Sequence, residues 1–200
     1  PSFIVTLGTL NIAFALTQIY AESQTITGLP TALTKLGDTF SVAGTAITYG
    51  SLVTLGLFAL TWYALTQTAW GRHIYAIGDN AEAARLMGIP VRRTLLGVYV
   101  IAGVIYGIAA LLLVARTGSG DPNAGQTDNL DSITAVVLGG TSLFGGRGTI
   151  IGTLIGAVIV GVLRNGLVLE GVAAIYQVLI TGMLVILAVS VDQLARRRTA

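Results

Sequence analysis

Long stretches without a charged residue alternate with short polar connections along this chain. Four of these stretches cover residues 1–21, 39–71, 94–115 and 171–191. A helix that crosses the hydrocarbon core of a membrane needs about 20 mostly apolar residues, and each stretch is long enough to supply them. In the second stretch the most apolar part is 49–66. The pattern therefore predicts four transmembrane helices.

Two shorter apolar stretches, 132–146 and 148–163, are separated only by Arg147 in a Gly-Gly-Arg-Gly context. We interpret them as two shorter or tilted helices joined by a tight turn, with a re-entrant pair as the alternative. Helices satisfy their own backbone hydrogen bonds in lipid, and the alternation of a membrane β-barrel is absent. The expected fold is all-α: a polytopic membrane helical bundle with about six membrane segments, in one transmembrane domain over 1–200.

Composition agrees with a membrane location and excludes several classes of protein. Of the 200 residues, 54% are hydrophobic and 10% charged, against about 25% charged in a typical soluble domain. A soluble enzyme or a nucleic-acid-binding chain is therefore not expected. Cysteine is absent and His73 is the single histidine, so neither a thiolate site nor a multi-histidine metal site is available. We expect no cofactor and no metal.

The lysines and arginines fall mainly on one side of the predicted membrane. If the C-terminus is cytoplasmic and six spans alternate, eight of the eleven basic residues lie inside: Arg72, Arg85, Arg92, Arg93, Arg147, Arg196, Arg197 and Arg198. Lys35, Arg116 and Arg164 lie outside. Since basic residues concentrate in cytoplasmic loops, this distribution predicts a cytoplasmic C-terminus and a cytoplasmic 71–93 loop.

The 71–93 loop contains a short helix of its own. Asp79 or Asn80 can accept hydrogen bonds from the first free amides, and Glu82 follows Asp79 by three residues, as in a capping box. Gly88 suits a left-handed C-terminal cap, and Pro90 prevents continuation. About two turns of helix are marginal alone. This helix must pack on its own membrane helices, lie at the lipid interface, or dock into a partner.

Residues in and after this loop resemble a known family. Glu82-Ala83-Ala84-x-x-x-Gly88 matches the E-A-A-x-x-x-G loop of ABC importer permeases. The block 121–157 resembles the ribose-type, simple-sugar subfamily through Leu138-Gly139-Gly140-Thr141 and Gly145-Gly146-Arg147-Gly148. The resemblance covers essentially all 200 residues and the C-terminal two-thirds of the family's chain. The chain begins with Pro1, and we expect that upstream helices are missing.

The resemblance implies the permease subunit of an ATP-driven importer in the bacterial inner membrane. Its implied partners are cytoplasmic ABC ATPase subunits, an extracytoplasmic sugar-binding protein, a second permease subunit as a homodimer, and membrane lipid, with no nucleic acid. The ATPase would dock on a coupling helix within 79–89. The implied coupling residues are Glu82, Ala83, Ala84, Arg85, Leu86, Met87 and Gly88. Arg85, Arg92 and Arg93 either pair with acids of the ATPase or serve only to orient the chain.

The chain itself is not expected to be an enzyme. No G-x-x-x-x-G-K-[ST] phosphate loop is present, so ATP hydrolysis is expected on a separate subunit. No charged residue lies clearly at the middle of a predicted span, so the sequence does not indicate a proton path. A branched-chain amino-acid-type ABC permease and an ATP-independent secondary transporter or channel remain alternatives.

Several glycines and polar residues have simple structural explanations. Gly148, Gly152 and Gly156 are spaced for close helix packing, as are Gly103 and Gly107. We expect packing within the chain rather than between subunits. The outer acids Asp121, Asp128 and Asp131 are expected to be solvated, or to receive arginines of the binding protein. The polar residues available to an uncharged substrate are Thr6, Thr9, Asn11, Gln18, Tyr106, Thr141, Ser142 and Gln177, and the sequence does not select among them.

Overall fold

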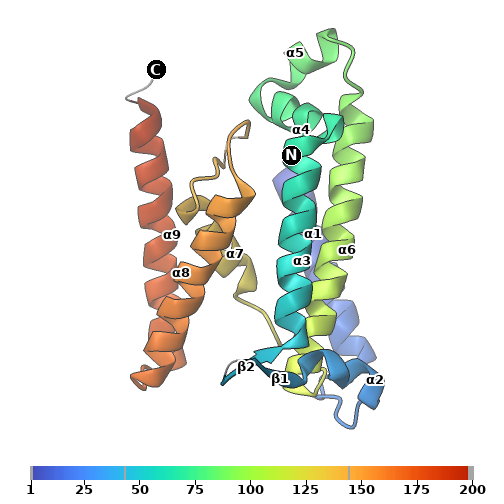
Figure 1. The fold of residues 1–200 in the computed structure, drawn as a ribbon, viewed down its shortest axis with the longest axis vertical. Coiled ribbons are helices and arrows are strands. Elements are labelled where there is room, and N and C mark those ends of the chain that lie inside the picture. Colours follow the sequence, from blue (N-terminus) through green and yellow to red (C-terminus); the bar gives the residue numbers. More distant parts are fainter. Residues whose placement is uncertain (1, 43, 144, 198–200) are drawn as a thin grey trace. The chain divides into compact units, whose positions relative to one another are not determined.

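The computed structural model describes residues 2–42, 44–143 and 145–197, and the described residues are mainly helical (Figure 1). The elements in chain order are α1 (Ser2–Tyr20), α2 (Thr31–Thr34), the 3-10 helix η1 (Lys35–Gly37), β1 (Thr39–Val42), β2 (Thr45–Thr48), α3 (Tyr49–Gln67), α4 (Ala69–Asp79), α5 (Ala81–Leu86), α6 (Val91–Thr117), α7 (Asp128–Leu138), α8 (Ile150–Leu169) and α9 (Ala174–Arg197). The six predicted membrane segments coincide wholly or in part with α1, α3, α6, α7, α8 and α9. The expectation of an all-α membrane bundle is confirmed.

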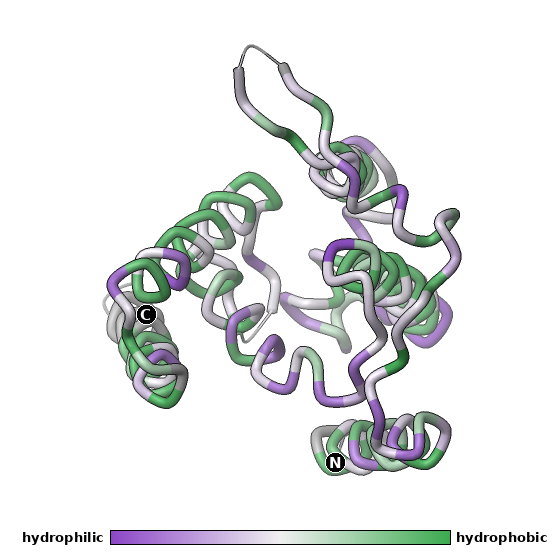
Figure 2. The backbone as a smooth tube through the Cα atoms, turned by 90° about the horizontal axis from the view of Figure 1, so that it is seen from below, coloured by the Kyte–Doolittle hydropathy of each residue, from purple (hydrophilic) through white to green (hydrophobic). Residues whose placement is uncertain are grey.

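Three of these helices, α3, α6 and α8, are long and apolar enough to cross a membrane. The apolar parts of α1 and α9 are shorter, Ile4–Tyr20 and Ile175–Leu187. Hydrophobic residues recur along the helical coils in Figure 2, and none of the most apolar window of α3 is buried. Apolar side chains exposed along whole helices are expected where lipid or further helices cover them.

Helix α7 is short, as predicted, because its 11 residues extend only about 16 Å at 1.5 Å per residue. The hydrocarbon core is about 30 Å thick. Helix α8 is longer than expected, since its 20 residues continue past Arg164, where an outer loop was predicted. The charge of Arg164 is compatible with a continuing helix because Asp131 and Asp128 lie beside it.

The described chain forms two compact units. One unit comprises Pro1–Thr54 and Ile101–Ala124, and the other comprises Leu55–Val100 and Gly125–Ala200. Helices α3 and α6 run through both units.

The first unit contains a β-hairpin that the sequence analysis did not predict. Strands β1 and β2 pair antiparallel, with Thr39 opposite Thr48 and Phe40 opposite Ile47. The ring of Phe40 lies 4.9 Å from that of Tyr49 at the start of α3. Because 39–48 is uncharged and rich in β-branched residues, its hydropathy merged with that of the following span.

The second unit contains α7, α8 and α9, which lie side by side (Figure 1). The α7–α8 contact depends on glycine. A Cβ built on Gly156 would overlap the carbonyl oxygen of Ala135, and one on Gly152 would overlap that of Gly139. The predicted packing within the chain is therefore confirmed for Gly152 and Gly156. Gly148 precedes α8 and is not part of a helical stripe. Gly103 and Gly107 have no neighbouring atom within 4 Å of a built Cβ.

Replacing Gly156 with leucine is expected to lower the free energy of unfolding by about 1–3 kcal/mol, the usual cost of overpacking. The leucine side chain has no room because the α7 backbone occupies its position. Thermal unfolding of the full-length protein in detergent would measure the loss. Gly161→Leu is the matched control, because Gly161 also lies in α8 and a Cβ there meets nothing within 4 Å. Equal transition temperatures for both variants would contradict the packing argument.

Candidate functional site

The predicted loop 71–93 is more ordered than expected because most of it belongs to helices. Helix α4 directly follows α3, and Thr68 caps it by accepting a hydrogen bond from the Gly71 amide over 3.2 Å. Gly71 and Ile77 are the buried residues of α4. Helix α4 was not predicted from the sequence. The signal that could have revealed it is the amphipathic pattern over 69–79, where apolar residues recur at helical spacing.

Helix α5 lies at the predicted coupling position, and its N-terminal cap is one of the two candidates that the sequence left open. Asp79 is the last residue of α4, and Asn80 caps α5 by accepting from the Ala83 amide over 3.0 Å. Glu82 is therefore not at the third helical position, and the predicted capping-box arrangement with Asp79 is not present. Asn80 was the second of the two predicted caps, and it is the correct one.

The end of α5 agrees with the prediction for Gly88, whose φ is +84°. The Ile89 amide donates to the Ala84 carbonyl and the Gly88 amide to the Arg85 carbonyl, both over 3.0 Å. These two bonds form a Schellman motif, which ends a helix with a left-handed residue. Pro90 follows, and α6 begins at Val91. The motif gives α5 a fixed length of six residues.

The two faces of α5 differ in exposure. Ala84 is buried, at 2% exposed, and α5 as a whole contacts α4. Leu86 and Met87 are 87% and 79% exposed. Glu82, Ala83, Arg85 and Gly88 are exposed as well. The structure thus brings all seven predicted coupling residues onto one short segment, and two large apolar side chains on it have no cover within the described chain.

The arginines near α5 have no ionic partner in the described part of the chain. The ion pairs found among the described residues both involve Arg164. Arg85, Arg92 and Arg93 are exposed. His73 is half-buried within α4. Within the described residues, no group of three or more possible metal ligands occurs.

Helix α4 also contacts the glycine-rich turn between α7 and α8. The Tyr75 hydroxyl donates to the Gly148 carbonyl over 2.9 Å. A Cβ on Gly78 would lie 2.6 Å from the Gly146 nitrogen, and one on Gly145 would lie 2.5 Å from the Gly78 oxygen. The backbones of α4 and the turn therefore touch directly, and this joins the α4–α5 segment to the α7–α8 hairpin.

The opposite end of the α7–α8 hairpin has an ion-pair cluster. Arg164 of α8 donates to Asp131 of α7 and lies 3.8 Å from Asp128. The prediction that these acids are merely solvated is wrong for Asp131, whose side chain is 16% exposed. Sequence alone could not pair residues 33 positions apart. Asp121 accepts from the Asn123 amide over 2.8 Å, which makes it part of a local turn.

The eight polar residues that the sequence makes available to an uncharged substrate do not all belong to one of the two compact units. Thr6, Thr9, Asn11, Gln18 and Tyr106 belong to the first unit, and Thr141, Ser142 and Gln177 belong to the second. Gln18 donates to Asn123 over 2.9 Å. Of these eight residues, Gln177 lines a cavity among α7, α8 and α9.

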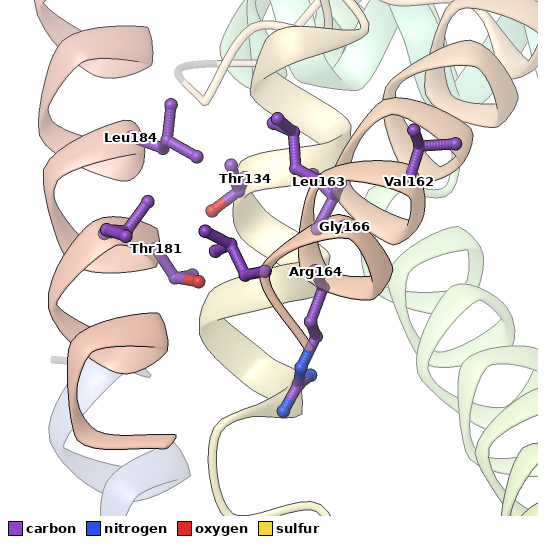
Figure 3. Close-up of a pocket in the computed structure, with 10 residues that line it drawn as sticks. Thr134, Val162, Leu163, Arg164, Gly166, Thr181 and Leu184 are labelled. Atoms are coloured by element: carbon purple, nitrogen blue, oxygen red, sulfur yellow. The ribbon is translucent and has the colours of Figure 1, made fainter. Parts of the chain in front are cut away.

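Two adjoining cavities lie among α7, α8 and α9. The larger, about 270 Å³, is mainly apolar, and Leu163, Leu184 and Thr134 are among its lining residues (Figure 3). The smaller, about 220 Å³, is lined by Thr127, Leu130, Asp131, Arg164, Gln177, Val178 and Thr181. Arg164 and Thr181 line both.

Replacing Gly88 with valine is expected to loosen α5, because a non-glycine residue in the left-handed region costs about 1–2 kcal/mol. Amide hydrogen exchange of residues 81–87 should become about tenfold faster. Gly88→Asn is the matched control, since asparagine tolerates this backbone conformation. Identical exchange in both variants would show that the left-handed cap does not hold α5.

Comparison with known proteins places the chain in a family. The family model described as "Branched-chain amino acid transport system / permease component" matches residues 1–189. The chain is 45% identical over 205 residues to the fructose import permease protein FrcC of Rhizobium meliloti, which covers 100% of this chain and 57% of that protein. It is 43% identical over 195 residues to the ribose import permease protein RbsC of Bacillus subtilis, covering 96% and 59%. No solved structure matches.

A third relative is the xylose transport system permease protein XylH of Escherichia coli, 47% identical over 137 residues that cover 68% of this chain and 35% of that protein. The chain thus spans less than three fifths of the length of these curated relatives. The family match nevertheless extends through every membrane-length helix found here. The chain belongs to the branched-chain amino acid transport system permease family, whose curated members here are simple-sugar import permeases.

Proposed function

We propose that the full-length protein is the membrane-spanning permease subunit of an ATP-driven ABC importer for a monosaccharide of the ribose class. The proposal includes one transmembrane permease domain over residues 1–200. The observation that carries it is α5, a six-residue helix fixed at both ends, with Leu86 and its C-cap residue Met87 exposed. A short capped helix with an uncovered apolar face is suited to insertion into a groove of another protein.

In this proposal Ala84 seats α5 on α4, and the other six coupling residues face the ATPase. Leu86 and Met87 enter its groove, while exposed Ala83 allows close approach of the backbone. Glu82 and Arg85 border the contact as charged residues. Gly88 provides the sharp exit toward α6. When the ATPase subunits close on ATP, α5 moves as a rigid piece because its caps hold its length.

The orientation of the chain is part of the proposal. The α4–α5 segment touches the turn that contains Arg147, so two of the arginine-bearing segments that were expected to be cytoplasmic lie together. We propose that both are cytoplasmic, together with the C-terminus, in the bacterial inner membrane. The Arg164 cluster, at the other end of the α7–α8 hairpin, then lies on the outer side.

The substrate class is inferred from relatives named for fructose, ribose and xylose. They support a sugar over a branched-chain amino acid, despite the wording of the family description. The proposed partners are ABC ATPase subunits, an extracytoplasmic sugar-binding protein and a second permease copy. ATP hydrolysis belongs to the ATPase subunits, and this chain is a transport subunit.

Reconstitution tests the proposal directly. The full-length protein is placed in proteoliposomes with the ATPase and binding protein from neighbouring genes, and uptake of labelled ribose, fructose, xylose and leucine is measured with and without ATP. Uptake of one sugar that requires ATP is the expected result. Sugar uptake without ATP would favour a secondary transporter or channel, and uptake of leucine alone would favour the amino-acid permease. Either result would overturn the proposal.

A further inference from the structure

The cavities among α7, α8 and α9 lie outside the proposed ATPase-coupling segment and have no role in it. Their positions are defined within one compact unit. Figure 3 shows Thr134 on the central helix facing the space between α8 and α9, with Leu184 and Thr181 on the opposite wall. The smaller cavity adjoins this space at Arg164 and Thr181.

The smaller cavity combines hydrogen-bond donors and acceptors of several kinds. Asp131 supplies a carboxylate, Arg164 a guanidinium and Gln177 an amide. The Gln177 amide nitrogen donates to the Val172 carbonyl over 2.8 Å, and this bond leaves its carbonyl oxygen as an acceptor. Arg164 uses one terminal nitrogen for Asp131 and has further N–H donors. Thr127 and Thr181 add hydroxyls. Neighbouring sugar hydroxyls require this combination, since each can donate and accept.

The charge of the cluster selects against anions. Two carboxylates, Asp128 and Asp131, face the single guanidinium of Arg164, so the cluster carries a formal charge of about −1. A ligand carboxylate or phosphate would meet an arginine that is already paired and an acid that repels it. A neutral polyol is not repelled by the carboxylates and does not need an unpaired arginine. The adjoining apolar cavity can take the C–H face of a sugar ring through Leu163, Leu167 and Ile180.

We infer that the paired cavities among α7, α8 and α9 form a binding station for a neutral monosaccharide on its way through the permease, with Asp131, Arg164, Gln177 and Thr181 as hydroxyl ligands. This inference rests on the proposed function. Under the proposed orientation, the ion-pair cluster places the station near the outer side. Helix α7 is too short to span the membrane, so its N-terminal end can lie below the surface where a delivered sugar enters.

Substrate protection of introduced cysteines tests this site, because the 200 residues contain no cysteine. Thr181→Cys and Gln177→Cys are made separately in the full-length chain, assembled with its ATPase and binding protein in proteoliposomes. Modification by a membrane-impermeant maleimide is timed with ribose, fructose, xylose, glucuronate or leucine present. The transported sugar should slow modification of at least one variant about fivefold or more, and glucuronate and leucine should not.

Glu170→Cys is the matched control, since Glu170 follows α8, is exposed and does not line either cavity. Its modification rate should not change with sugar. Two cysteine variants keep the test valid if one fails to assemble. If sugar is taken up with ATP and neither cavity cysteine is protected, the inferred binding station is wrong and the proposed function stands. Protection by leucine or glucuronate instead would also overturn it. If no sugar is taken up at all, the proposed function fails, and the inference fails with it.

Discussion

Replacing Leu86 and Met87 together with aspartate is expected to reduce ATP-driven uptake at least a hundredfold. Both side chains are almost fully exposed on α5, so the change leaves the permease's own packing intact. In the proposed ATPase groove, two carboxylates would be buried without partners, and a single unpaired buried charge already costs several kcal/mol. Since about 1.4 kcal/mol is a factor of ten in an equilibrium constant, ATPase binding should be lost.

The measurements are ATPase co-purification with the full-length permease and sugar uptake in proteoliposomes. Leu86→Met with Met87→Leu is the matched control, because the swap preserves apolar volume and should retain both readouts. Permease abundance and thermal unfolding should be unchanged in the aspartate variant. Normal ATPase recovery with the two aspartates present would show that α5 is not the docking helix.

Replacing Gly78 with valine is expected to uncouple ATP hydrolysis from transport. A Cβ at this position would lie 2.6 Å from the Gly146 nitrogen, so α4 and the α7–α8 turn must separate. The contact between them connects α5 with the hairpin whose opposite end contains the Arg164 cluster. Sugar uptake should fall tenfold or more, while the ATPase still binds α5 and hydrolyses ATP.

Gly97→Val is the matched control, since Gly97 is also a helical residue of the second compact unit. A Cβ at Gly97 makes an ordinary contact, 3.7 Å from the Trp70 ring nitrogen. Gly97→Val should keep most uptake. Tyr75→Phe should have a smaller effect than Gly78→Val, because it removes one hydrogen bond without forcing the backbones apart. If uptake and hydrolysis fall equally in Gly78→Val, the contact supports folding and does not transmit motion.

The sequence predicted the C-terminal end of α5 better than it predicted the elements around that helix. Gly88 and Pro90 marked the end of α5 because glycine readily adopts the left-handed backbone conformation that ends a helix, whereas proline cannot continue one. The choice between Asp79 and Asn80 stayed open, since both are good caps. It was settled by α4, which ends at Asp79. The hairpin 39–48 was missed because apolarity alone does not distinguish a strand from the start of a membrane helix.

By itself, the sequence determined the class of protein, because several charge-free stretches of about 20 residues are typical of helices that cross lipid, and local chemistry located the C-terminal end of α5. Only the tertiary structure decided which distant residues meet: Arg164 with Asp131, Gly156 with Ala135, and Gly78 with Gly146. Each pairing depends on how whole helices approach one another. A glycine or an arginine in the sequence is compatible with several partners, and the approach of the backbones selects one.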